Sequence, residues 1–293
     1  MLIFRPDGTF TITQFTDLHY RNGEAADLQT IRLMNAVLDT EKPDLVVLTG
    51  DVIDGFFCQN PIQSYARAVQ PIVDRGLPWA AVFGNHDDEG SASRGQLMAS
   101  MRELPGCLAT AGPADLSGVG NYTLPIMHGD RIAATLCFLD SHAYADKTEK
   151  AYDWIKQDQI EWYLKTAEHF KNQNKGQTVP SLMFFHIPLP EYDDVWNTGK
   201  CIGEKHEAVC CPRFNSGLFA AMKSAGNVPG VFVGHDHVND YAGDLDGIQL
   251  CHGRCTGFSS YGRAGFPRGA RVIRLHAGER AFETWVRSDQ IAG

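Results

Sequence analysis

The sequence predicts an α/β protein in which helices alternate with buried strands. Five apolar runs of four to eight residues are typical of strands covered on both faces: 45–49, 79–83, 132–139, 181–185 and 230–233. Longer segments between them carry apolar residues at helical spacing. No internal repeat and no long linker divides the chain, so we expect one domain over residues 1–293.

Elements in the first half of the chain follow from periodicity. Residues 10–16 (FTITQFT) alternate in period two, which predicts a strand with one exposed face. A helix is expected next, because an apolar stripe precedes a break at Pro43; the stripe is Ile31, Met34, Val37 and Leu38. A second stripe predicts a helix later in the chain: Ile160, Tyr163, Leu164, Ala167 and Phe170.

In the second half, the irregular segment 186–215 separates two polar blocks and is long enough to be a functional loop. Its apolar and proline residues predict an ordered cover: Pro188, Pro190, Trp196 and Phe214. Segments 247–251, 270–276 and 281–287 predict a closing antiparallel set, with turns at Asp246-Gly247 and Ala277-Gly278.

Five apolar runs each end in a polar cluster suited to metal binding. The clusters are Asp17-Leu18-His19, Gly50-Asp51, Gly84-Asn85-His86-Asp87, Phe185-His186 and Gly234-His235-Asp236-His237. A buried strand that stops in Asp, Asn or His delivers that side chain to the carboxyl edge of a sheet, where open α/β folds build their sites. Any one cluster alone is an ordinary strand end. Together, all of oxygen or imidazole type, they predict a two-metal hydrolytic centre.

The order of these clusters resembles the calcineurin-like metallophosphoesterase superfamily, which carries D-x-H, G-D, G-N-H-D, a lone His and G-H-x-H. The resemblance implies a four-layer α/β/β/α sandwich of two mixed sheets. It also implies that Asp51 bridges two ions. Asp17, His19 and His237 would bind one ion, and Asn85, His186 and His235 the other. Mixed imidazole and carboxylate ligands favour two divalent Mn, Fe or Zn ions over Mg or Ca.

The same resemblance gives His86 the role of stabilising the transition state and protonating the leaving oxygen, with Asp87 as the residue that orients it. The expected activity is hydrolysis of phosphomonoesters by metal-activated water. A phosphodiesterase with the same site is the first alternative. The second is a non-catalytic scaffold that binds proteins, although such members typically lose a ligand or the catalytic His.

Residues after 181 resemble a subgroup of purple-acid-phosphatase-like enzymes that includes small plant members and yeast cell-cycle phosphatase relatives. The matching stretches are 184–192, 214–222, 231–240 and 259–272. From this likeness, and from strand-end position for His142, the candidate substrate contacts are Tyr192, Asn215, Tyr261, Arg263 and His142. Purple enzymes carry an iron-ligand Tyr three residues after the bridging Asp. Here Asp54 stands at that position.

The amino-acid composition limits the classes of substrate and binding partner that we expect. The net charge of −9 gives no basic surface for nucleic acid, so we expect a small-molecule or phosphoprotein phosphate ester as substrate. The eight cysteines show no zinc-ribbon spacing and are expected to be reduced thiols. No signal-peptide core or membrane span is visible, so a cytoplasmic location is the default expectation.

Overall fold

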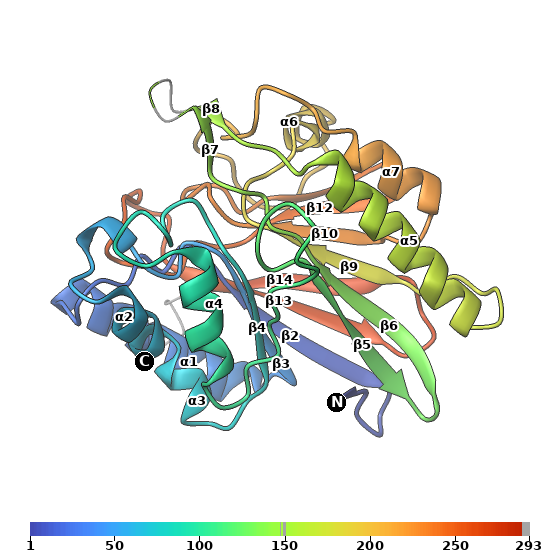
Figure 1. The fold of residues 1–293 in the computed structure, drawn as a ribbon, viewed down its shortest axis with the longest axis horizontal. Helices are drawn as coiled ribbons and strands as arrows, with labels where there is room; N and C mark the ends of the chain where they lie inside the picture. Colours follow the sequence, from blue (N-terminus) through green and yellow to red (C-terminus); the bar gives the residue numbers. More distant parts are fainter. Residues whose placement is uncertain (147, 149–150, 289–293) are drawn as a thin grey trace.

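The computed structural model describes residues 1–146, 148 and 151–288. Two large mixed sheets pack face to face at its centre, and helices lie on both outer sides (Figure 1). The predicted fold class, an α/β/β/α sandwich, is confirmed. No helix among the described residues is long and apolar enough to cross a lipid bilayer.

The first large sheet has five strands in the order β14-β13-β2-β3-β4. Strands β2, β3 and β4 are parallel, and β13 runs antiparallel to both β2 and β14. Their bounds are β2 (Thr9–Phe15), β3 (Leu45–Thr49), β4 (Trp79–Val82), β13 (Gly269–His276) and β14 (Phe282–Ser288). The three parallel strands end at the same edge, which is the edge that carries the first three polar clusters.

The second large sheet has seven strands in the order β1-β5-β6-β9-β10-β12-β11. Strands β6, β9, β10 and β12 are parallel neighbours, while β5 and β11 pair antiparallel at either side. Their bounds are β1 (Leu2–Ile3), β5 (Tyr122–His128), β6 (Arg131–Phe138), β9 (Ser181–Phe184), β10 (Gly230–Val233), β11 (Ala242–Leu245) and β12 (Ile248–His252). A separate hairpin pairs β7 (Tyr144–Asp146) with β8 (Ala151–Tyr152).

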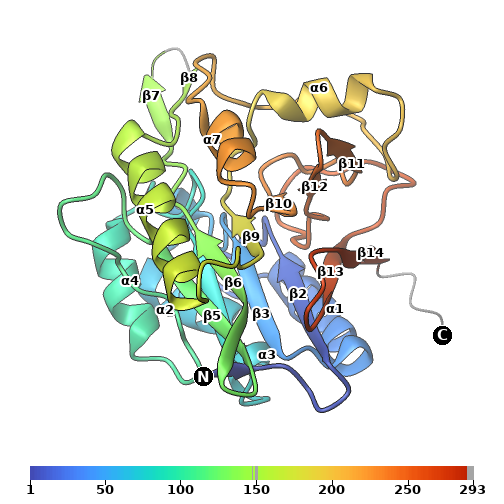
Figure 2. The same ribbon diagram turned by 90° about the vertical axis from the view of Figure 1, so that its right-hand side faces the viewer.

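The helices divide between the two outer faces (Figures 1 and 2). On the side of the five-stranded sheet lie α1 (Ala25–Glu41), α2 (Pro61–Ala68), α3 (Gln70–Val73) and α4 (Arg94–Arg102). On the side of the seven-stranded sheet lie α5 (Gln157–Gln173), α6 (Glu191–Asn197) and α7 (Leu218–Ala225). A short 3₁₀ turn, η1 (Gly55–Phe57), follows the second polar cluster.

Alternate residues of the seven-stranded sheet enter two different hydrophobic cores. Phe138, Phe184 and Phe232 belong to the core between the sheets, and their rings stack in a row at 5.2 Å between centroids. The intervening residues Met183 and Val231 belong to the core under α5, α6 and α7. Because both faces of each strand are covered, the sequence needs apolar residues at every position, which explains the continuous apolar runs.

The structure corrects two expectations about the strands. Six of the seven residues of β2 are buried, so this strand is not half exposed. Its polar residues point inward, as the Gln14 amide shows by donating to the Val233 carbonyl of the other sheet at 3.0 Å. The expected closing set is divided, because β12 joins the seven-stranded sheet whereas β13 and β14 complete the five-stranded one.

Candidate metal centre

The strand ends deliver the polar clusters to one place. Beyond β2 and β3 the backbone pairing continues: Asp17 N donates to Gly50 O at 3.1 Å and His19 N donates to Asp51 O at 2.9 Å. Four of the expected ligands have positive φ: Asp17 (53°), His19 (46°), Asp51 (48°) and His235 (77°). A left-handed turn directly after a strand costs backbone energy but redirects the next side chains, and such strain tends to gather at functional sites.

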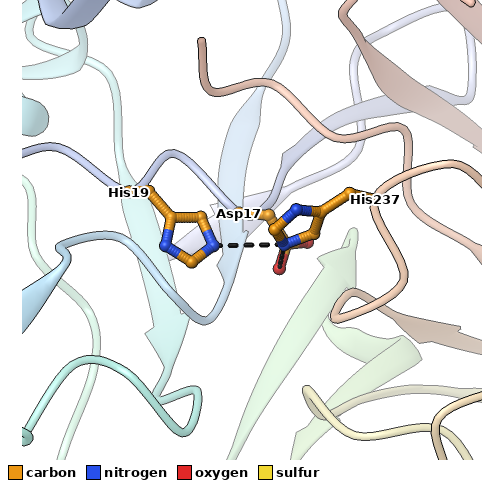
Figure 3. A group of neighbouring side chains, drawn as sticks. All are labelled: Asp17, His19 and His237. Atoms are coloured by element: carbon orange, nitrogen blue, oxygen red, sulfur yellow. Dashed lines mark hydrogen bonds and ion pairs between the residues drawn. The ribbon is translucent and has the colours of Figure 1, made fainter. Parts of the chain in front are cut away.

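The first group of ligand atoms comes from Asp17, His19 and His237 (Figure 3). The Nε2 atoms of His19 and His237 lie 3.1 Å apart, and Asp17 Oδ1 lies 3.4 Å from His237 Nε2. The other carboxylate oxygen of Asp17 is held by Thr16 Oγ1 at 2.7 Å and by the His235 amide at 3.0 Å. The His235 amide also donates to Oδ1, at 3.2 Å, and Oδ1 is the oxygen that faces His237.

The second group comes from Asp51, Asn85, His186 and His235. His186 Nε2 lies 3.1 Å from Asp51 Oδ2, 3.1 Å from His235 Nδ1 and 3.2 Å from Asn85 Oδ1. His186 Nδ1 lies 2.8 Å from the Thr49 carbonyl, which can only accept a hydrogen bond. In the neutral ring this contact places the proton on Nδ1 and leaves the lone pair of Nε2 available to bind a metal.

Asp51 joins the two groups. Its Oδ2 lies 3.1 Å from His186 Nε2 and 3.8 Å from His19 Nε2, while its Oδ1 accepts a hydrogen bond from the His86 amide at 2.8 Å. The same oxygen, Oδ2, therefore faces both sets of imidazoles. The structure brings together all seven side chains that the resemblance assigns to metal binding, in the expected division.

The ligand atoms of the two groups are better placed to bind a pair of cations than to bond to one another. Asp51 Oδ2, which faces imidazoles of both groups, is buried with no hydrogen-bond partner. Acceptor atoms face acceptor atoms at hydrogen-bond distance, which is costly unless positive charge lies between them. The buried Asp51 carboxylate favours positive charge beside it: burial would lower the pKa of His186, but this carboxylate raises it to about 9, and a bound cation would supply that charge instead of a proton. Burial lowers the pKa of His19 to about 3, so this ring stays neutral and able to bind a metal.

Glycines give the site its close approaches. A Cβ on Gly84 would lie 2.1 Å from Asp51 Oδ1, and one on Gly234 would lie 2.0 Å from Thr16 Oγ1. Each distance is far below van der Waals contact, so any other residue would push a ligand or its partner out of place. The glycine before Asn85 and the one before His235 are thus part of the site's geometry.

The structure corrects the role expected for Asp87. This buried carboxylate accepts hydrogen bonds from three backbone amides, those of Gly84 at 2.7 Å, Asp51 at 3.0 Å and Ile53 at 3.0 Å. It braces the two loops that carry Asp51 and Asn85 instead of orienting His86. Both of its oxygens are directed at these amides, and the described contacts of the His86 imidazole include Glu89 instead.

Glu89 is the carboxylate that contacts His86, with 2.6 Å between Oε2 and Nδ1. Burial would lower the pKa of His86, but the Asp51 charge and this hydrogen bond raise it to about 9. The His86 ring lies 5.2 Å from the His19 ring, between centroids, at the edge of the first ligand group. Asp54 forms a small cluster with His86 and Glu89, and it is paired with Arg21 at 3.0 Å.

Of the five candidate substrate contacts, two lie away from the ligands. Tyr192 is fully buried, and its hydroxyl is within hydrogen-bond distance of the Val231 carbonyl at 3.2 Å, because α6 packs onto the sheet. It offers nothing to a substrate, which corrects the expectation. Asn215 is exposed and its amide donates to Glu191 at 2.7 Å, so it stabilises the 186–215 segment instead.

The other three candidates differ in their relation to the centre. The Tyr261 ring stacks on His237 with 4.2 Å between centroids, and its hydroxyl donates to Glu207 at 2.8 Å. His142 lines a cavity of about 230 Å³ that opens beside Asn85. Arg263 is exposed in the same loop as Tyr261, where its backbone pairs with Phe266.

Sequence reasoning missed several residues around the centre. Arg94 is one: its guanidinium pairs with Asp140 and donates to the Gly84 carbonyl at 2.8 Å, which braces the loop that carries Asn85. Tyr144 and Tyr152 of the β7–β8 hairpin are others, since they contact Asn85 and His235 respectively. Only Glu89 had a usable signal, because it follows His86 by three residues and can reach it on a tight turn.

The sequence matches the calcineurin-like phosphoesterase family model over residues 10–239, which includes all seven candidate ligands. This chain belongs to the calcineurin-like phosphoesterase family. It is 35% identical to "Probable inactive purple acid phosphatase 29" of Arabidopsis thaliana over 98% of this chain and 84% of the relative. It is 38% identical to "Phosphatase DCR2" of Saccharomyces cerevisiae over 96% of this chain and 54% of that protein.

A solved structure supports the fold of this phosphoesterase. This chain superimposes on the structure of a dimetal phosphatase from Danio rerio with a TM-score of 0.60, at 14% identity, covering 95% of this chain and 98% of the other. The relatives confirm the purple-acid-phosphatase-like subgroup inferred from the sequence. The chain is a metal-dependent phosphoric ester hydrolase, and its two groups of ligands match the dinuclear metal dependence of its family.

Proposed function

We propose that this phosphoesterase hydrolyses phosphomonoesters with two Mn²⁺, Fe²⁺ or Zn²⁺ ions. The observation that carries the proposal is the shared Asp51 Oδ2, which faces both groups of imidazole ligands from within a buried cluster. Bound there, two divalent ions would activate a water molecule and neutralise the phosphoryl oxygens of the substrate. The names of the relatives, purple acid phosphatase and phosphatase, favour a monoester substrate for this chain too.

The chain's own residues have separate tasks in this reaction. Asp17, Asp51 and the imidazoles hold the charge of the centre, and Asp87 ties the two loops that carry Asp51 and Asn85. His86 keeps one ring nitrogen on Glu89, so its Nε2 is the nitrogen available to protonate the leaving oxygen. A dianionic monoester suits this site because the ions and His86 supply positive charge on more than one side.

Two alternatives keep the same residues but change the outcome. A phosphodiesterase could use the same ligands, but a nuclease would need a basic surface that the charge of −9 does not favour. A protein-binding scaffold needs no catalytic histidine, yet His86 and all seven ligand side chains are present here. "Inactive" in the name of the plant relative is said of that protein. Because the net charge is negative, we propose a small-molecule or phosphoprotein substrate and no nucleic acid.

Substrate panels would test the proposal. Purified protein loaded with Mn²⁺, Fe²⁺ or Zn²⁺ would be assayed with p-nitrophenyl phosphate, phosphoserine and phosphotyrosine peptides, bis-p-nitrophenyl phosphate and cyclic nucleotides. We expect the monoesters to be hydrolysed with the higher kcat/KM, and chelators to abolish the activity. Faster turnover of the diesters would make the enzyme a phosphodiesterase. No turnover of any ester by protein that retains two ions per chain would favour the scaffold.

A further inference from the structure

The β7–β8 hairpin stands apart from both large sheets (Figure 1) and carries two tyrosines that contact the second ligand group. The rings of Tyr144 and Tyr152 stack with 5.7 Å between centroids. Tyr152 also meets the imidazole of His235 edge to face, with 4.4 Å between the ring centroids and 88° between the ring planes. The Tyr144 hydroxyl accepts a hydrogen bond from Asn85 Nδ2 at 3.0 Å.

Asn85 depends on the direction of its amide. Its Oδ1 faces His186 Nε2 at 3.2 Å, and an amide binds a cation only through that oxygen. If the amide turned by half a rotation, two N–H bonds would face the cation instead. Asn85 is 1% exposed, so water has little access to its Nδ2. The Tyr144 hydroxyl is the partner that the described residues give to this nitrogen.

The two hairpin tyrosines contact the second ligand group. Within the described part of the chain, the hydrogen bonds and ring contacts of Tyr144 and Tyr152 reach Asn85 and His235. The first group is contacted instead by Tyr261, whose ring stacks on His237 from a different loop. Loss of a hairpin contact should therefore affect the two cations unequally.

We propose that Tyr144 is a positioning residue which holds the Asn85 amide in its metal-binding orientation. Through Asn85 it raises the affinity of the group Asp51, Asn85, His186 and His235 for its cation, with little effect on the group Asp17, His19 and His237. This role rests on the proposed function only in that both groups bind divalent ions. Partners that orient a metal ligand typically contribute about 10- to 100-fold to metal affinity.

Metal titration tests this role without any substrate. Metal-free wild-type protein, Tyr144→Phe and Tyr152→Phe would be titrated with Mn²⁺ by calorimetry, with electron paramagnetic resonance to distinguish paired from single ions. Both variants lose one phenolic oxygen and keep the stacked rings, so Tyr152→Phe is the matched control. We expect Tyr144→Phe to weaken one site about tenfold and leave the other within about twofold, while Tyr152→Phe binds as wild type does.

A double-mutant cycle identifies the path through Asn85. Asn85→Ala should weaken the same site by more than Tyr144→Phe does, and adding Tyr144→Phe to it should have no further effect, because the amide it positions is gone. Additive losses in the double variant would overturn the proposal. Equal weakening of both sites would also overturn it, as would the same loss in Tyr152→Phe.

Two further readouts separate positioning from a general loss of structure. Melting of the metal-free variants in chelator should give the same midpoint for Tyr144→Phe and Tyr152→Phe, and a lower midpoint for Tyr144→Phe alone would count against the proposal. The Mn²⁺ concentration for half-maximal phosphatase activity should rise about tenfold in Tyr144→Phe, with kcat restored at saturating Mn²⁺. If the substrate class proposed above were wrong, the calorimetric result would still stand.

Discussion

The metal ligands and the aromatic rim around them differ in burial and in backbone. The seven ligand side chains are between 0% and 8% exposed, and four of them have positive φ at the ends of strands. The rim residues are the tyrosines that contact these side chains: Tyr144 and Tyr152 of the β7–β8 hairpin are half-buried, and Tyr261 of a loop is 54% exposed. One region is fixed by two sheets, and the other is held mainly by side-chain contacts.

This difference determines which changes the enzyme can tolerate. Charges in the buried centre interact through a low effective dielectric, so removal of one charge leaves the others uncompensated. Charges and rings in the rim are solvated, and their interactions are typically worth less than about 1 kcal/mol. We therefore expect substitutions in the centre to alter the affinity for both ions, and substitutions farther out to alter rates, pH dependence or the affinity of one site.

The largest effect is expected from Asp51→Asn. The substitution keeps the shape of the side chain but removes the charge that both ligand groups share through Oδ2. We expect loss of affinity for both ions by more than the roughly 10- to 100-fold seen when only a ligand's partner is removed. Metal analysis after dialysis measures it. Asp54→Asn is the matched control, since this carboxylate pairs with Arg21 and should leave the metal content unchanged.

A smaller effect is expected from His86→Ala, because this residue lies beside the ligands without belonging to either group. The variant should keep two ions per chain and lose at least about 10²-fold in turnover of poorly activated esters. Esters with a good leaving group need less protonation and should be less affected. His276→Ala, whose imidazole contacts Glu283 at 2.6 Å much as His86 contacts Glu89, serves as the control. Equal rates in His86→Ala and wild type would remove His86 from the role of general acid.

Glu89→Gln should shift the pH profile more than it changes the maximum rate. The Glu89 hydrogen bond contributes to the raised pKa of His86, which lies at about 9. A general acid works while protonated, so activity is lost as pH rises through that pKa. Neutral Gln still accepts a hydrogen bond but lowers the pKa, and the alkaline limb of kcat should move to lower pH by about one unit.

The neighbouring carboxylate provides the control for that measurement. Asp88 lies one residue away but faces Arg94, with 3.3 Å between Oδ1 and Nε. Asp88→Asn should therefore leave the alkaline limb in place. A limb that moves equally in both variants would indicate a general change of charge near the site, with no special role for the Glu89–His86 pair.

The gathering of the seven candidate ligands could be predicted from the sequence because strand ends are visible in it. An apolar run that stops at Asp51 or His186 is readable residue by residue, and parallel strands bring such ends to one edge. The partners of these residues were not readable. Whether Asp87 faces His86 or the amides of Gly84 and Ile53 depends on a turn of three residues, and apolar periodicity carries no information about it.

Tertiary packing also decided the elements that the sequence placed wrongly. Strand β2 alternates in polarity as an exposed strand does, yet it is covered on both faces because Gln14 and its polar neighbours lie between layers. Strand β12 follows the same kind of turn as β14, but it pairs with β10. The local sequence pattern does not indicate which distant strand becomes the partner. The short strands β7 and β8 had no apolar signal at all.

The smallest expected effect is the absence of colour. Purple enzymes of the resembling subgroup owe their colour to a tyrosinate bound to ferric iron, and here Asp54 occupies the corresponding position and is paired with Arg21. Tyr192 cannot replace that ligand, because its hydroxyl is buried against the Val231 carbonyl. Tyr144 contacts the amide nitrogen of Asn85, a neutral donor that stabilises a hydroxyl acceptor without calling for a charged phenolate.

The other tyrosines that contact the candidate ligands resist ionisation, and burial raises the pKa of Tyr261 among them. Burial raises the pKa of Tyr144, and it raises the pKa of Tyr152 further. We therefore expect iron-loaded protein to show no strong visible band, and Tyr144→Phe to leave its spectrum unchanged while weakening one metal site. A visible band that disappears in Tyr144→Phe would show that this residue binds iron directly. Tyr144 would then belong to the buried centre, and the division between ligands and rim drawn above would have to move to include the hairpin.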